Sequence, residues 1–81
     1  MAENTKILIV DDEVNIRDAL ATLLSKAGYD VSTAAGGEEA TRVMQEAAFD
    51  LAIVDLKMPG MGGIELLRWM KEYSPDSEVI V

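Results

Sequence analysis

Two short apolar runs that each end in acidic residues constrain the fold of this chain more than any other feature. The first run, at residues 7–10, is followed by Asp11 and Asp12. The second run, at residues 51–54, is followed by Asp55. Short apolar runs separated by segments of helical periodicity are typical of parallel strands that are buried on both faces of a sheet. Because ligands bind outside the carboxyl ends of such strands, the sequence predicts that the three acids meet at one edge of a parallel sheet.

The rest of the chain completes an alternating pattern of strands and helices. We expect strands at about residues 6–10, 29–34, 50–54 and 78–81, and helices at about 14–26, 38–48 and 64–73. The second strand alternates in character, which predicts an edge position, and Gly28 is expected to end the first helix. In the first helix the apolar positions Ile16, Leu20, Leu23, Leu24 and Ala27 recur at helical spacing, and in the second Ala40, Val43, Met44 and Ala47 share one face. In the third helix Leu67 and Met70 are expected to face inward. With right-handed connections, this order predicts an α/β fold with a doubly wound parallel sheet.

Composition excludes several classes of function. The formal net charge is −8, from 15 acids against 7 bases, which disfavours direct binding of nucleic acid by this segment. The chain has no cysteine and no histidine, so disulfides, thiolate nucleophiles, cysteine-ligated zinc and imidazole bases are excluded. Residues 1–10 resemble neither a signal peptide nor a membrane span. We therefore expect a cytoplasmic protein that does not bind a membrane.

The three acids form the candidate functional site. Carboxylates that are brought together repel one another unless a cation lies between them, and Mg²⁺ prefers hard oxygen ligands. The loop after Asp55 can supply a further ligand, the backbone carbonyl of Lys57. Asp55 can then act as a carboxylate nucleophile toward a phosphoryl donor and form an acyl phosphate. Alternatively, Asp11 or Asp12 only caps the helix that follows, as acids at strand ends often do.

Two other charged residues have simpler interpretations. Asp50 precedes a predicted strand, at the opposite edge of the sheet, and is expected to be an ordinary turn acid. Arg17 is expected on a solvated helix face, within reach of the rim of the acidic pocket.

With these residues in view, the chain resembles the receiver domain of response regulators. The resemblance rests on residues 7–13, ILIVDDE, and on residues 50–67, in which Asp55 is followed by Met-Pro-Gly and then by Gly-Ile-Glu-Leu-Leu. It covers the whole chain in order and in spacing. The acid pair alone would be a weak signal, whereas the two segments together are highly specific. The fold that the resemblance implies is flavodoxin-like, with strand order 2-1-3-4-5 in the full family.

The resemblance also implies a role for each site residue. Asp55 matches the phosphoacceptor aspartate, Asp12 a direct carboxylate ligand of Mg²⁺, and Asp11 a neighbouring ligand that often acts through water. The backbone carbonyl of Lys57 matches the remaining protein ligand. The implied partner is a histidine kinase or a phosphotransfer protein, which would hold the phosphohistidine. The implied role is that of a signalling module and not of an enzyme.

The length of the chain departs from the family pattern. Only four strands and three helices are predicted, so we expect residues 1–81 to be the N-terminal fragment of a receiver domain. The switch hydroxyl, the late lysine and the last helices of the family are missing from it. We expect the strand at 78–81 to be an uncovered edge, and apolar side chains of the first and third strands to be partly exposed. Such surfaces drive association, so the fragment is expected to dimerise.

Two functions from other classes stay open at this point. One is a metal-dependent phosphohydrolase with an aspartyl nucleophile, although phosphatases of the haloacid-dehalogenase type need a second acid two residues after the nucleophile, where Lys57 stands. The other is an interaction module that is never phosphorylated.

Overall fold

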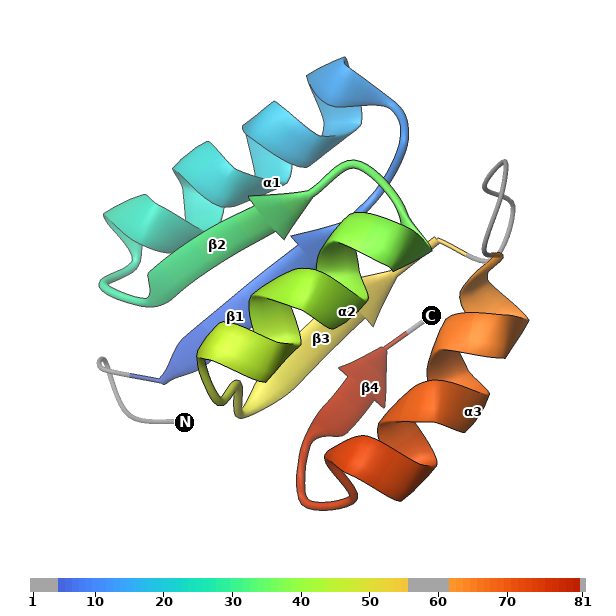
Figure 1. Cartoon of the computed structure of the whole chain (residues 1–81). Coiled ribbons are helices and arrows are strands. Elements are labelled where there is room, and N and C mark those ends of the chain that lie inside the picture. Colours follow the sequence, from blue (N-terminus) through green and yellow to red (C-terminus); the bar gives the residue numbers. More distant parts are fainter. Residues whose placement is uncertain (1–4, 56–61, 81) are drawn as a thin grey trace.

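The predicted strands and helices all form, with boundaries within two residues of those expected (Figure 1). The computed structural model describes residues 5–55 and 62–80. The elements in chain order are β1 Lys6–Val10, α1 Val14–Lys26, β2 Asp30–Ala34, α2 Gly37–Glu46, β3 Leu51–Val54, α3 Gly63–Tyr73 and β4 Glu78–Ile80. Gly28 ends the α1 region with a φ of 100°, a conformation that glycine adopts more readily than other residues. The predicted helix stop is therefore confirmed.

The strands form one parallel sheet in the order β2-β1-β3-β4. The register places Ile9 beside Thr33 on one side and beside Ile53 on the other. β2 lies at one edge of the sheet, as its alternating sequence predicted, and β4 lies at the other. The doubly wound parallel sheet is thus confirmed. Because all the strands run in one direction, their carboxyl ends meet at one edge (Figure 1).

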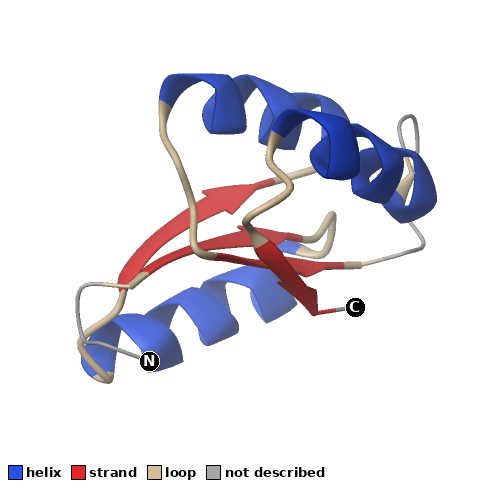
Figure 2. Ribbon diagram, turned by 90° about the horizontal axis from the view of Figure 1, so that it is seen from below, coloured by secondary structure: helices blue, strands red, loops and turns tan. Residues whose placement is uncertain are grey.

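Helices cover the two faces of the sheet unequally. α1 lies on one face, whereas α2 and α3 lie on the other (Figure 2). Successive strand residues point to opposite faces, so β1 divides its side chains between two cores. Leu8 and Val10 enter the core beneath α2 and α3, and Ile7 and Ile9 enter the core beneath α1. The larger core contains Leu8, Val10, Ala34, Ala40, Met44, Phe49, Ala52, Val54, Leu66 and Met70.

The inward face of α1 holds only some of the apolar residues that recur at helical spacing. Leu20 and Leu24 pack against the sheet, but no residue of α1 is fully buried. Ile16 and Leu23 are 51% and 65% exposed, and Ala27 is also exposed. Helical spacing of apolar residues therefore does not place all of them in the core. Within residues 5–55 and 62–80, α1 is the only helix on its face, so no neighbouring helix covers its flank.

The other two helices follow their predicted patterns more closely. In α2, Ala40 and Met44 are buried, and Val43 and Ala47 pack against the same core. In α3, Met70 is buried as predicted, but the most deeply buried leucine is Leu66, with no exposed surface, and Leu67 is only half-buried. The inward face of α3 therefore passes through residues 63, 66 and 70, which recur at helical spacing.

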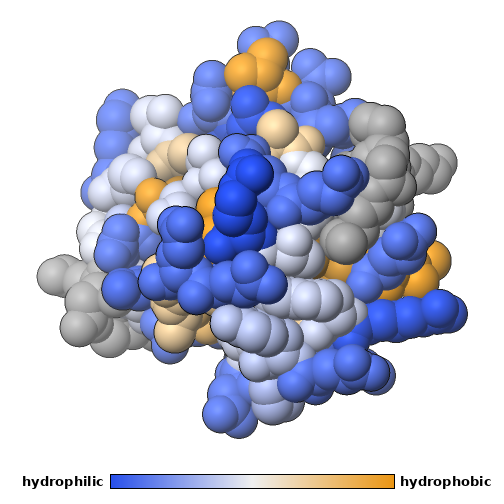
Figure 3. Space-filling model, viewed as in Figure 1, coloured by the Kyte–Doolittle hydropathy of each residue, from blue (hydrophilic) through white to orange (hydrophobic). Residues whose placement is uncertain are grey.

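The sheet itself is better covered than expected. Ile7 and Ile9 on β1 are buried, so the prediction that this strand would be partly exposed was wrong. On β3, Leu51 is buried and Ile53 is half-buried. Ile80, on the edge strand β4, is 54% exposed. In the view of Figure 3, the surface is largely hydrophilic, and hydrophobic residues gather only in small separate areas.

Candidate functional site

The ends of β1 and β3 bring the predicted site residues together. The N–H of Asp55 donates to the carbonyl of Val10 at 3.0 Å, and the N–H of Asp11 donates to the carbonyl of Ala34 at 3.2 Å. These bonds continue the parallel pairing just past the strands. Since Val10 pairs with Val54 in register, the acid that follows each of them lies at the same edge of the sheet. Residues far apart in the sequence thus become neighbours.

Asp11, Asp12 and Asp55 form a tight carboxylate cluster at this edge. One carboxylate oxygen from each residue lies within 4.8 Å of the others. Asp11 and Asp55 are half-buried and Asp12 is exposed. Two opposite oxygens in an octahedral Mg²⁺ shell lie about 4.2 Å apart, twice the usual Mg–O distance, and the ion usually keeps several waters. Oxygens within 4.8 Å of one another are close to this separation, so these hard ligands suit Mg²⁺ held in part through water.

Lys57, the residue predicted to offer a backbone carbonyl to the cation, lies outside the described residues. Its role as a ligand stays a prediction.

Asp11 also serves the backbone at the start of α1. Its Oδ1 accepts a hydrogen bond from the N–H of Glu13 at 2.9 Å, as in an Asx turn. Glu13 is the N-cap of α1 and its own side chain makes no capping bond. One carboxylate oxygen of Asp11 thus bonds to the backbone at the start of α1, in line with the capping role considered from the sequence. The same carboxylate also belongs to the cluster with Asp12 and Asp55.

Arg17 reaches the same loop from the first turn of α1. Its Nη1 donates to the backbone carbonyl of Asp11 at 2.7 Å, and the side chain is half-buried. Sequence reasoning placed this arginine within reach of the pocket rim but did not give it a bonding partner. The sequence signal for this contact was the position of Arg17, a positively charged residue six positions after Asp11.

Asp50 lies at the opposite edge of the sheet, as expected. Its Oδ2 accepts a bond from the N–H of Lys6 at 2.9 Å, and its own N–H donates to the carbonyl of Lys6 at 2.9 Å. Asp50 therefore joins the start of β3 to the start of β1 and takes no part in the carboxylate cluster.

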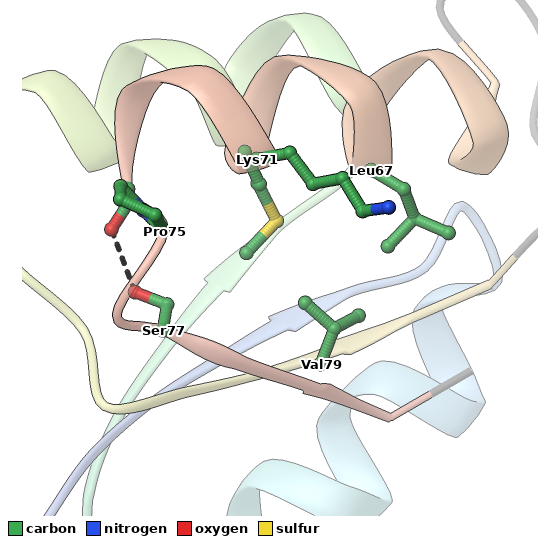
Figure 4. A pocket seen from close by; sticks show the side chains of 7 residues that line it. Leu67, Lys71, Pro75, Ser77 and Val79 are labelled. Carbon is green, nitrogen blue, oxygen red and sulfur yellow. Dashed lines mark hydrogen bonds between the residues drawn. The ribbon is translucent and has the colours of Figure 1, made fainter.

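A pocket of about 280 Å³ opens between α3 and β4 (Figure 4). The side chains of Leu67 and Val79 line it from the helix and the strand, and Lys71 lies along its rim. Ser77 fixes the turn at its end, with its hydroxyl donating to the carbonyl of Phe49 at 2.6 Å. The other lining residues are Met70, Ser74, Pro75 and Ser77. None of the lining residues carries a carboxylate. The turn that holds Ser77 precedes β4 and so lies at the amino ends of the strands, whereas the acidic site lies at their carboxyl ends. The pocket is therefore separate from the acidic site.

In the described parts of the chain, none of the helices combines the length and the apolar character needed to cross a membrane.

Comparisons with known proteins agree with this geometry. The family described as "Response regulator receiver domain" matches residues 7–81. Sporulation initiation phosphotransferase F of Bacillus subtilis is 42% identical over 78 residues, which cover 96% of this chain and 63% of that protein. The chain therefore spans less than two thirds of the length of this relative.

Solved structures give the same result. The response regulator TrrA of Thermotoga maritima, solved in complex with Mg(2+)-BeF, superposes with a TM-score of 0.89 at 39% identity, covering 95% of this chain and 67% of that one. The complex of histidine kinase ThkA with TrrA gives a TM-score of 0.85 at 39% identity, covering 93% of this chain and 65% of the matched one.

Proposed function

This chain belongs to the family of response regulator receiver domains, and from that premise we propose that Asp55 accepts a phosphoryl group while Mg²⁺ is bound beside it. The observation that carries the proposal is the meeting of three carboxylates within 4.8 Å at the carboxyl edge of a parallel sheet. Strand ends at this edge are where such sheets bind their ligands. A single aspartate there would have little meaning, whereas three of them form a site for a cation and its anionic partner.

The phosphoryl donor in this proposal is a phosphohistidine on another protein. The chain contains no histidine, so a phosphohistidine cannot form within it. A carboxylate oxygen of Asp55 attacks the phosphorus, an O–P bond forms, and the N–P bond to the imidazole breaks. The product is an acyl phosphate on Asp55. The solved complex of a histidine kinase with the similar regulator TrrA supports a kinase as the partner, and a phosphotransfer protein would offer the same chemistry.

The cation would be held by the acidic residues in different ways. Asp12 and Asp55 are proposed as direct ligands, because each offers a charged oxygen to the same small volume. Asp11, whose Oδ1 already accepts a backbone hydrogen bond, is proposed to act through water. The carbonyl of Lys57 is the further ligand that the family resemblance implies. When bound, Mg²⁺ supplies positive charge that offsets the carboxylates and attracts phosphoryl oxygens.

We further propose that residues 1–81 form part of one receiver domain, which acts as a signalling module and not as an enzyme. The family match over residues 7–81 and the single sheet support this assignment. Membership in the family also favours the module over the phosphohydrolase considered from sequence. The expected cytoplasmic location and the expected lack of contact with nucleic acid stay predictions.

Self-association of this chain is a separate proposal. β4 is the outermost strand on its side of the described sheet, and Ile80 is 54% exposed on it. The pocket between α3 and β4 presents apolar side chains such as Leu67 and Val79 next to that edge (Figure 4). An exposed strand edge beside apolar surface is a template for pairing with a second copy.

Calorimetric titration with Mg²⁺ tests the metal site. Asp12→Asn and Asp55→Asn should each weaken binding strongly, because each removes a charged oxygen from the shell of a hard cation. Asp50→Asn is the matched control, since it makes the same chemical change at the opposite edge of the sheet. Equal affinity in all three variants would remove the metal site from the proposal.

Labelling with acetyl phosphate tests the acceptor. In a full-length version of this receiver domain, we expect one phosphoryl group to be added in the presence of Mg²⁺, as measured by mass spectrometry, and none in its Asp55→Asn variant. Labelling that persists in Asp55→Asn would show that another residue is the acceptor.

A further inference from the structure

Arg17 is a half-buried cation at the acidic site that the proposed phosphoryl transfer does not use. We infer that Arg17 is a positioning residue, which holds the peptide between Asp11 and Asp12 in the orientation that cation binding requires. This inference rests on the proposed function, because it assigns a role in forming the same metal site.

The contact made by Arg17 is short and directed at the backbone. Its Nη1 lies 2.7 Å from the carbonyl oxygen of Asp11, and hydrogen bonds from a charged donor are among the stronger ones in proteins. Arg17 is also joined to the loop through its own backbone, since its N–H donates to the carbonyl of Glu13 at 3.0 Å. Arg17 therefore links the first turn of α1 to Asp11, the residue that comes directly before the exposed Asp12.

Asp11 is held at three atoms in consequence. Its N–H donates to Ala34, its carbonyl accepts from Arg17, and its Oδ1 accepts from the N–H of Glu13. The carbonyl of Asp11 and the N–H of Asp12 belong to one planar peptide group. Fixing that carbonyl fixes the plane of the peptide, and with it the direction in which the chain enters Asp12.

Asp12 depends on this support more than its neighbours do. It is exposed, whereas Asp11 and Asp55 are half-buried at the ends of strands. Groups that orient a metal ligand without touching the metal commonly contribute tenfold or more to metal affinity. The guanidinium acts on Asp12 in this way, through the backbone of Asp11.

Because Arg17 is positively charged, a charge effect and a positioning effect would change the affinity for Mg²⁺ in opposite directions. A positive group beside the site repels Mg²⁺, so an arginine that acted only through its charge would weaken binding, and its removal would tighten binding. An arginine that positions the acids has the opposite effect, and its removal weakens binding. The direction of the change in affinity therefore separates the two roles.

The test measures the affinity of the intact chain for Mg²⁺ by calorimetry, with a urea midpoint for each variant to confirm folding. Arg17→Met is expected to bind Mg²⁺ about tenfold more weakly than the wild type. Arg17→Lys keeps the charge and a donor, and should recover part of the loss. Arg42→Met removes the same charge from an exposed position on α2 and should bind like the wild type. If Arg17→Met does not fold, Arg17→Gln takes its place.

Each outcome has a defined meaning. Unchanged or tighter binding in Arg17→Met would overturn the inference alone, provided that Asp12→Asn still weakens binding strongly. If Arg17→Lys binds Mg²⁺ as weakly as Arg17→Met, the loss comes from packing and not from the hydrogen bond, and the inference is also overturned. A wild-type chain that does not bind Mg²⁺ would overturn the proposed metal site, and this inference with it.

Discussion

Replacing Asp12 with asparagine is expected to stabilise the metal-free protein while it removes the response to Mg²⁺. The reason is that the three carboxylates of the site repel one another when no cation lies between them. Asp12 suits the test because it is exposed and asparagine is close to aspartate in size, so the substitution disturbs no core packing.

The size of the effect follows from the geometry of the cluster. Two unit charges 4.8 Å apart in water repel by about 1 kcal/mol, and Asp12 takes part in two such pairs, with Asp11 and Asp55. Neutralising it therefore relieves about 1–2 kcal/mol at low salt. The variant also loses attraction between the carboxylate and the N-terminus of α1, which is worth about 0.3–1 kcal/mol. The net gain in the free energy of unfolding is about 1 kcal/mol, and salt near 0.15 M should reduce the repulsion by about half.

The assay is urea unfolding followed by circular dichroism, first with a chelator and then with Mg²⁺ at about 100 times its dissociation constant. Under the second condition the wild type should gain about 2.7 kcal/mol, and the variant far less. The order of the two stabilities should therefore reverse when Mg²⁺ is added.

Asp30→Asn is the control for this measurement, because Asp30 is an exposed acid at the start of β2, away from the cluster. Asp50 is unsuitable, since its carboxylate accepts a hydrogen bond from Lys6. A metal-free Asp12→Asn protein that is no more stable than the wild type at low salt would refute the repulsion argument.

Three further predictions concern the fold and its assembly. Leu66→Ala should cost about 2–5 kcal/mol in urea unfolding because Leu66 has no exposed surface, whereas Ile64→Ala, at a position 58% exposed, should cost about 0.5 kcal/mol or less. Ser77→Ala should cost about 1–2 kcal/mol because the carbonyl of Phe49 loses its 2.6 Å hydrogen bond, and an unchanged urea midpoint would contradict this. Light scattering should show a mass above that of a monomer that rises with concentration, and Ile80→Lys should lower it; a monomer at every concentration would exclude association through β4.

The features that could be predicted from sequence are those that local pattern determines. The apolar runs at 7–10 and 51–54 identify β1 and β3, because strands buried on both faces need continuous apolar sequence. Gly28 marks the end of the α1 region because its backbone adopts a positive φ. The meeting of the three acids was predictable for the same reason, since parallel strands place their carboxyl ends at one edge.

The features that sequence did not predict depend on which elements share a face. Ile16 and Leu23 fit a helical apolar pattern, but their exposure depends on whether a second helix packs beside α1. Leu66 and Leu67 are adjacent leucines, and only the start of α3 at Gly63 decides which of them turns inward. The bond from Arg17 to the carbonyl of Asp11 requires the turn between β1 and α1 to be known first.

The pairing of β1 with β3 has a consequence for when the site exists during folding. Lys6 and Asp50 are separated by 44 positions in sequence, and α1, β2 and α2 all lie between their strands. Pairings across such a separation require a long loop to close, and topologies rich in them fold more slowly than those built from local contacts. An unfolded or still-growing chain holds Asp55 apart from Asp11 and Asp12, and so offers no assembled acceptor site. If the proposed phosphorylation of Asp55 needs all three acids, only molecules in which β1 and β3 have already paired could be phosphorylated, and unfolded copies would stay unlabelled.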